Sequence, residues 1–79
     1  MIYVYAIKSA VNAEIYVGIA KDADRRLKDH NAGKNRYTKG LMPWVTLYRV
    51  LQPDWEAARK REKYLKSGVG KEFLRSLVP

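Results

Sequence analysis

Two strand-like segments separated by a short polar break begin the chain, and this pair constrains the fold more than any other feature. Residues Ile2–Ile7 are β-branched, aromatic or apolar throughout, as in a central strand that is covered on both faces. Small and polar residues follow over Ser9–Ala13, and Glu14–Gly18 again has strand character. Strands so close in sequence pair as an antiparallel hairpin with a longer turn. We therefore expect the chain to be built on an antiparallel sheet.

The rest of the chain alternates between helix and strand signals. Asp22 and Asp54 are good N-cap residues, and Gly33 and Gly68 follow the two helical segments as stop signals. The predicted elements are strands 2–7 and 14–18, a helix from about 22 to 31, a basic loop 32–42, a strand 44–51, a helix 55–67 and a helix 71–77 with Phe73, Leu74 and Leu77 on one side. This β-β-α-β-α-α order predicts one α+β domain over residues 1–79, with a small three-stranded antiparallel sheet flanked by helices.

Composition narrows the classes of partner and metal site. The 79 residues include no cysteine, which excludes disulfides and thiolate zinc sites, so any metal must be bound by oxygen or by the single His30. The formal net charge of +8 indicates a polyanionic partner, most often nucleic acid, or a basic surface that serves solubility. No segment has the pattern of a signal peptide or a membrane span, so we expect a cytoplasmic protein without a membrane partner.

Polar residues occupy helix positions that the periodicity reserves for the core. The inward stripe of the first helix is Ala23, Arg26, Leu27 and His30. The inward stripe of the next helix is Trp55, Ala58, Glu62 and Leu65. A buried charge needs a partner or a metal. An internal Glu62–Arg26 salt bridge is one interpretation, and a functional site is the other.

Two tyrosines of the hairpin are candidates for the same site. Tyr5 and Tyr16 share one face of the sheet if paired residues have numbers that sum to 21 or 23, and a sum of 22 separates them. Tyrosine in a small strand is usually a core residue. Gly18 fits a position that another backbone or a ligand approaches closely, and it also fits a strand end.

These residues, in this order, resemble the GIY-YIG nuclease domain, and most of all its small stand-alone bacterial members. The two signatures correspond to Tyr3-Val4-Tyr5 and Tyr16-Val17-Gly18. The arginine ten residues after the second tyrosine is Arg26, and the His or Tyr one turn later is His30. The metal-binding glutamate of the next helix corresponds to Glu62. The resemblance covers essentially the whole chain and rests on five positions with consistent spacing.

The resemblance implies a three-stranded antiparallel sheet with helices and phosphodiester cleavage on one metal, Mg²⁺ or Mn²⁺, at Glu62. Related domains occur in the excision-repair nuclease subunit and in homing endonucleases. Repair-type relatives carry a lysine where this chain has Ile19, and several homing and restriction relatives have an asparagine beyond the glutamate helix, whereas none follows Glu62 here. The resemblance therefore does not assign a substrate preference.

The candidate residues suit the tasks of phosphodiester hydrolysis. The planar fork of Arg26 can hold two phosphate oxygens, and Glu62 can hold a hard cation that keeps several waters. A free phenol has a pKa near 10, so Tyr5 or Tyr16 acts as a base only if cations favour the phenolate. His30 could instead take the tyrosine's proton or contact the phosphate, and the sequence leaves these options open. The loop residues Lys34, Arg36 and Lys39 are expected to bind the flanking backbone.

The expected function is that of a metal-dependent endonuclease acting on nucleic acid, with DNA as the expected substrate. Two alternatives remain, namely a nucleic-acid-binding module that has lost turnover and a basic structural domain with an internal ion pair. A protein partner or self-association would have to supply any specificity that nucleic-acid shape does not, because the chain has no separate sequence-reading domain.

Overall fold

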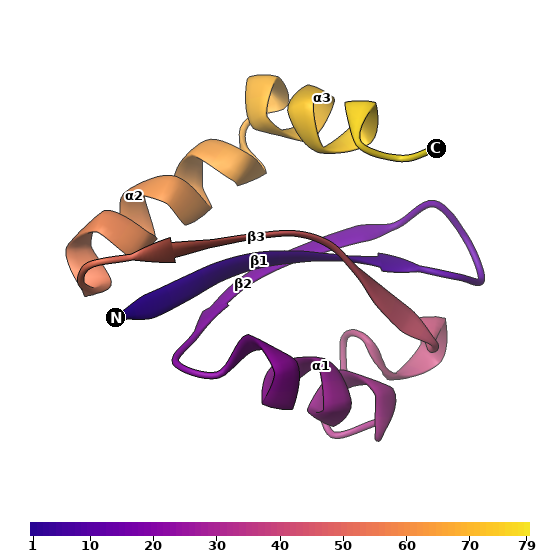
Figure 1. Ribbon diagram of the computed structural model, residues 1–79. Helices are drawn as coiled ribbons and strands as arrows, with labels where there is room; N and C mark the ends of the chain where they lie inside the picture. The colour runs from indigo at the N-terminus through magenta and orange to yellow at the C-terminus, as the bar shows by residue number, and fades with distance from the viewer.

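The computed structural model describes residues 1–79 as three strands and three α-helices (Figure 1). The elements are β1 (Ile2–Ser9), β2 (Ile15–Ala20), α1 (Ala23–Asn31), a short 3-10 helix η1 (Lys39–Leu41), β3 (Trp44–Gln52), α2 (Trp55–Lys66) and α3 (Gly68–Ser76). The predicted β-β-α-β-α-α order and the α+β class are confirmed, and η1 is the only addition. No helix combines the length and the apolar character that crossing a bilayer requires.

The three strands form one antiparallel sheet with β1 in the centre, in the order β2-β1-β3. Tyr5 pairs with Gly18 and Ile7 pairs with Tyr16, so the numbers of paired residues sum to 23. This is one of the two registers that place Tyr5 and Tyr16 on the same face, because paired residues and residues two apart project to one side.

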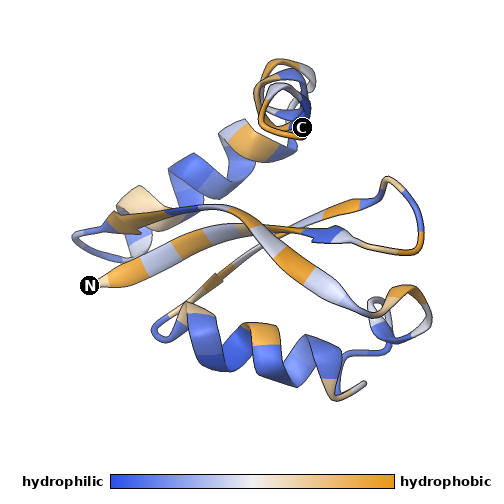
Figure 2. Ribbon diagram, turned by 45° about the vertical axis from the view of Figure 1, so that its right-hand side comes forward, coloured by the Kyte–Doolittle hydropathy of each residue, from blue (hydrophilic) through white to orange (hydrophobic).

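Strand β1 is covered on both faces, as its nearly continuous apolar sequence predicted (Figure 1). Helices α2 and α3 lie on one face, over a core formed by Ile2, Val4, Ala6, Val17, Ala58, Leu65 and Leu74. Helix α1 lies on the other face, beside a smaller cluster of Tyr5, Ile7, Ala23 and Trp44. Hydrophobic residues recur along the strands, whereas α1 and α2 are mostly hydrophilic (Figure 2). The site residues on the α1 face thus adjoin only a small core.

Local sequence signals set most helix ends. The Asp22 carboxylate accepts a hydrogen bond from the Arg25 N–H, and the Asp54 carboxylate accepts one from the Ala57 N–H, as expected for N-caps. Gly33 has a φ of 76°, a left-handed conformation that glycine adopts without a steric penalty. The predicted start of α2 and the predicted end of α1 are therefore confirmed.

The junction between α2 and α3 differs from the prediction, in which Gly68 closed the first helix and the last helix began at residue 71. Gly68 is instead the first residue of α3, and Ser67 ends α2 and caps α3 through its hydroxyl, which accepts from the Gly70 N–H. Gly70 explains the error, since a Cβ there would lie 2.0 Å from the carbonyl oxygen of Tyr64. Glycine at this junction serves close helix packing and not a left-handed stop.

Two apolar residues assigned to the inward helix faces are more exposed than predicted. Trp55 is 44% exposed and Leu77 is 39% exposed. Trp55 is the first residue of α2, ahead of the core positions Ala58 and Leu65, and Leu77 lies just beyond the last residue of α3. Periodicity predicts the direction in which a side chain points, but it does not predict where along the helix the underlying sheet ends. Both predictions were wrong for this reason.

Candidate active site

A chain of buried polar groups links the sheet to α1 and to the loop that follows α1. The Tyr5 hydroxyl lies 3.0 Å from Nε2 of His30, and Nδ1 of His30 lies 2.7 Å from Oγ1 of Thr38. Tyr5 is 2% exposed, and His30 and Thr38 are fully buried. A neutral imidazole has one donor and one acceptor nitrogen, so the hydroxyls of Tyr5 and Thr38 have opposite roles in the two hydrogen bonds. The three side chains can therefore relay a proton along a fixed path.

Burial keeps both titratable groups of this chain neutral. Burial lowers the pKa of His30, the Arg26 charge lowers it further, and Asp29 opposes the change. Burial also raises the pKa of the Tyr5 phenol; Arg26 opposes this through its hydrogen bond and its charge, and the Glu62 carboxylate acts in the same direction as burial. At neutral pH the free protein thus contains a phenol beside a neutral imidazole, and Tyr5 is not a phenolate.

Tyr16 completes an aromatic group around His30. The Tyr16 ring meets the His30 imidazole edge to face with centroids 5.0 Å apart, and its centroid lies 6.5 Å from that of Tyr5. Trp44 and Tyr37 also flank the ring, at 6.5 and 5.8 Å. Tyr16 is only partly buried, so it carries a hydroxyl at the boundary between the buried cluster and solvent.

Gly18 allows Tyr5 to take its position. The two residues pair across β1 and β2, and a Cβ on Gly18 would lie 2.5 Å from the Tyr5 hydroxyl oxygen. The Tyr5 ring therefore lies over the glycine backbone. Neither interpretation of Gly18 is observed as stated, because β2 continues to Ala20 and the group that approaches closely is the Tyr5 side chain, not another backbone or a ligand.

Arg26 stands at the exposed side of the cluster. Its side chain is 40% exposed, and its guanidinium is 3.7 Å from the Asp29 carboxylate of the same helix. Its charge acts on both Tyr5 and His30. An arginine that borders a buried polar cluster and still faces solvent is suited to bind a phosphate group.

Glu62 reaches the region from α2, on the other face of the sheet. The Glu62–Arg26 salt bridge, one of the two interpretations of the polar stripe, is absent, because Glu62 pairs with Lys66 at 3.0 Å and Arg26 pairs with Asp29. Steric direction explains the difference, since Lys66 is one turn away on the same helix whereas Arg26 lies across the sheet. The Glu62 side chain is 23% exposed, and its charge acts on the Tyr5 phenol. The inward stripe of α2 was thus assigned correctly at Ala58, Glu62 and Leu65, but Trp55 is exposed and the ion pair with Arg26 does not form.

A metal would find two isolated carboxylates in this region, Asp29 and Glu62. No group of three or more His, Cys, Asp or Glu side chains lies close enough together to hold an ion. Both carboxylates are partly exposed, but Asp29 already pairs with Arg26 and Lys34, whereas Glu62 pairs with Lys66 alone. This donor set fits Mg²⁺ or Mn²⁺, of which magnesium in particular keeps several waters and completes its coordination with substrate phosphate oxygens.

The three loop cations predicted to bind nucleic acid lie outside the cluster. Lys34 pairs with Asp29 at 3.5 Å, and Arg36 and Lys39 are exposed. The loop is anchored by Asn31, whose side chain bonds the backbone N–H and carbonyl of Trp44, and by the Trp44 indole N–H, which donates to the Thr38 carbonyl. The loop is thus fixed beside the cluster, and its cations project from it.

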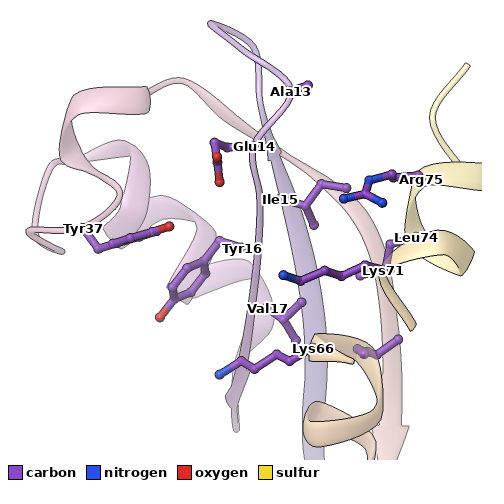
Figure 3. Close-up of a pocket in the computed structure, with 11 residues that line it drawn as sticks. Ala13, Glu14, Ile15, Tyr16, Val17, Tyr37, Lys66, Lys71, Leu74 and Arg75 are labelled. Carbon is purple, nitrogen blue, oxygen red and sulfur yellow. The ribbon is translucent and has the colours of Figure 1, made fainter. Parts of the chain in front are cut away.

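The protein has one cavity, of about 480 Å³, and it lies along β2 beside Tyr16 (Figure 3). Cations from the α2 end and from α3 line one side, and Tyr16 and Tyr37 line the other (Figure 3). These cations, namely Lys66, Lys71 and Arg75, were not among the site residues predicted from the sequence. The spacing of Lys71 and Arg75, one helical turn apart, was a signal for a shared face. Thr38 was also missed, and nothing in the sequence distinguishes it from other loop residues.

Comparison with known proteins agrees with this geometry. The model of the GIY-YIG catalytic domain matches residues 1–74. A UPF0213 protein of Staphylococcus haemolyticus is 35% identical over 76 residues, which cover 95% of this chain and 92% of that protein. A UPF0213 protein of Staphylococcus aureus is 32% identical over 74 residues, covering 92% and 89%. The solution NMR structure of a UPF0213 protein from Bacillus halodurans is similar with a TM-score of 0.58 at 36% identity, covering 98% of this chain and 85% of that one.

A family model that spans nearly the whole chain, and relatives matched over most of their own length, agree with the fold. The chain therefore belongs to the GIY-YIG nuclease family, and the relatives it matches are UPF0213 proteins.

Proposed function

We propose that this protein is a divalent-metal-dependent endonuclease that hydrolyses phosphodiester bonds of nucleic acid, with DNA as the substrate. The observation that carries the proposal is the hydrogen-bonded pair of Tyr5 and His30 beside a solvent-facing Arg26. Membership of a nuclease family supports it. A structural role alone would favour a closed ion pair between Arg26 and Glu62, and these residues have other partners.

Arg26 holds the scissile phosphate in this proposal. Its ion pair with Asp29 is long and partly exposed, so a phosphate can displace it at small cost. The guanidinium fork offers two parallel donors to phosphate oxygens and remains charged at every working pH. Negative charge that develops on those oxygens during attack is therefore stabilised by a positive group that is already in place.

The Tyr5–His30 pair accepts the proton of the attacking water. Water attacks phosphorus, a new O–P bond forms and the bond to the leaving oxygen breaks. The Tyr5 oxygen takes a proton from the water while its own phenolic proton passes to Nε2 of His30, 3.0 Å away. Tyr16 orients the water from the partly exposed edge. A bound phosphate offsets the Arg26 charge that lowers the pKa of His30, so substrate binding makes the imidazole a better acceptor.

Glu62 would hold the divalent ion, because it is the one carboxylate whose charge reaches the cluster from α2. The bound ion supplies Lewis-acid stabilisation of the phosphate and of the leaving oxygen. The ion would replace Lys66 as the partner of the Glu62 carboxylate. Because one carboxylate holds a metal weakly, we expect measurable occupancy only with millimolar metal or with substrate present.

The loop cations Lys34, Arg36 and Lys39 bind backbone phosphates distant from the scissile one. Their exposure and the anchored loop support this role. A protein partner or self-association supplies any specificity beyond nucleic-acid shape, and the expectation of a cytoplasmic location stays a prediction.

Metal-dependent nicking of supercoiled DNA tests the proposal. Arg26→Ala and Glu62→Gln should each reduce the cleavage rate by about 10²–10³, the usual effect of removing a group that stabilises charge in the transition state. Matched controls are Arg25→Ala and Glu56→Gln, which make the same chemical changes at exposed positions of the same helices. The controls should cleave like the wild type.

Two outcomes would contradict the proposal in different ways. Cleavage that persists in both site variants would remove Arg26 and Glu62 from the reaction. Tight, salt-sensitive DNA binding with no cleavage at any divalent-ion concentration would establish the alternative, a nucleic-acid-binding module on a nuclease fold.

A further inference from the structure

The cavity beside β2 adjoins the proposed site but contains cations that the reaction does not use. Tyr16 belongs to both, since it lines the cavity and its ring packs against the His30 imidazole with centroids 5.0 Å apart. Ile15, Val17 and Leu74 form an apolar part of its wall (Figure 3), and Leu65 also lines it. Its volume of about 480 Å³ is within the range of ligand sites in proteins, roughly 300–1,000 Å³.

The charge of the cavity is positive and largely uncompensated. Lys71 and Arg75 are exposed, project from one face of α3, and take part in none of the five ion pairs of the protein. Lys66 and Lys71 both extend toward β2 on the side of Tyr16, and Arg75 lies near Ile15 (Figure 3). Glu14 is the only carboxylate in the lining. Unpaired cations along a concave surface attract a polyanion.

The opposite wall of the cavity is aromatic. The Tyr37 ring is 64% exposed and lies 5.8 Å from the Tyr16 ring. A large exposed ring that faces a row of cations combines the two features of strand-binding grooves, a surface for stacking and a track for the backbone. Isolated exposed aromatics need no explanation, but this one lines the protein's only cavity.

We propose that this cavity is a substrate subsite, in which Lys71 and Arg75 hold backbone phosphates next to the scissile one and Tyr37 packs against a nucleotide of the same strand. The inference rests on the proposed function, because the scissile phosphate at Arg26 sets the direction of the bound nucleic-acid strand. That strand passes from Arg26 past Tyr16 into the cavity. Nucleic acid is favoured over an acidic peptide added to the edge strand β2, because Tyr16, whose ring packs against His30, also lines the cavity. The proposal also gives helix α3 the role of positioning the nucleic-acid strand.

The first experiment compares two double variants with the same charge change. Lys71→Gln/Arg75→Gln changes the cavity, and Arg59→Gln/Lys63→Gln changes two exposed, unpaired cations one turn apart on α2, outside the cavity. Binding of a fluorescently labelled DNA oligonucleotide is measured by anisotropy in EDTA, so that no cleavage occurs. The cavity variant should lower the slope of log affinity against log salt by about 2, and the α2 variant by much less.

The second experiment tests the aromatic wall. Tyr37→Leu should weaken binding at least about fivefold, the lower limit for loss of one stacking contact, whereas Tyr37→Phe should bind like the wild type. In cleavage assays the cavity variants should raise KM with little change in kcat, because they remove contacts made equally before and during the reaction. Unfolding midpoints in urea must match the wild type for each variant.

The failure of this inference is distinguishable from the failure of the proposed function. Equal salt slopes for the two double variants would overturn the subsite whether or not the protein cleaves DNA. Binding that depends on the cavity in a protein that never cleaves would uphold the subsite and reject the enzyme. Poly-glutamate that binds with the same dependence on Lys71 and Arg75, where the DNA does not, would assign the cavity to an acidic peptide and overturn the proposal.

Discussion

At the scale of single residues, the site depends on the absence of a side chain at Gly18. A Cβ there would lie 2.5 Å from the Tyr5 hydroxyl oxygen and 2.7 Å from Cζ of the same ring. The ring cannot yield easily, since Tyr5 is buried and hydrogen-bonded to His30. We expect Gly18→Ala to lower the free energy of unfolding by about 1–3 kcal/mol, as overpacking does, and to displace Tyr5. Urea unfolding measures the first effect and the nicking assay the second.

Gly40 provides the control for this substitution. A Cβ at Gly40 would meet nothing within 4 Å, and its φ is not positive. Gly40→Ala should leave stability unchanged or raise it by about 0.4–1 kcal/mol through the unfolded state. Equal effects at both glycines would show that Tyr5 does not need the space over Gly18.

His30 should make stability depend on pH. Its pKa is lowered in the folded protein from the ordinary value of 6.5, so below that value the unfolded chain binds more protons than the folded one. The stabilising contribution is full above pH 6.5 and is lost as the pH falls, by at most about 1.4 kcal/mol per unit for one proton. Unfolding free energies at pH 8 and pH 5.5 measure this.

His30 is the only histidine, so a pH dependence of stability that comes from a histidine can be assigned to His30. A His30→Gln variant should lose most of the pH dependence in this interval. An unchanged dependence in that variant would mean that other groups cause it.

At the scale of elements, the α2–α3 junction decides where the cations of α3 lie. Gly70 packs against the end of α2, where a Cβ would be 2.0 Å from the Tyr64 carbonyl oxygen and 2.5 Å from Cα of Leu65. Backbone atoms cannot move aside as a side-chain end can. Gly70→Ala should therefore destabilise by about 3 kcal/mol or more, at or above the upper end of overpacking effects.

Gly68→Ala is the control, because it makes the same substitution two residues earlier. A Cβ there would meet nothing within 4 Å, so Gly68→Ala should be tolerated. Urea unfolding of the two variants compares them directly. Similar losses would indicate that the close approach of α3 to α2 at Gly70 does not set the cost, since alanine has the higher helix propensity at both positions.

Elements set by local signals were predictable, and elements set by contacts were not. Asp22 and Asp54 cap helices through bonds to residues three positions on, and the strands follow β-branched and aromatic composition. Gly68 and Gly70 carry the same local signal as a helix stop, and only the neighbouring helix shows that Gly70 is a packing position. For the same reason Trp55 was misassigned to the core.

At the scale of the whole molecule, excess positive charge should dominate affinity for nucleic acid. There are 16 Lys and Arg residues against 8 Asp and Glu. If about five phosphates are neutralised, log affinity should fall against log salt with a slope of about −4 to −5. Titration of DNA at several salt concentrations in EDTA measures the slope. A slope near zero would exclude binding through the phosphate backbone.

The sequence by itself determined the order of the elements, the register options of the hairpin and the residue types that could bind a phosphate. These follow from the secondary-structure propensities of the residues and from the periodicity of hydrophobic positions, both of which act over a few residues. Only the tertiary structure decided that Tyr5, His30 and Thr38 form one hydrogen-bonded chain, that Glu62 pairs with Lys66 and not Arg26, and that α3 places two cations beside Tyr16. Those contacts join residues far apart in the chain, and their geometry depends on how closely glycines let the elements approach.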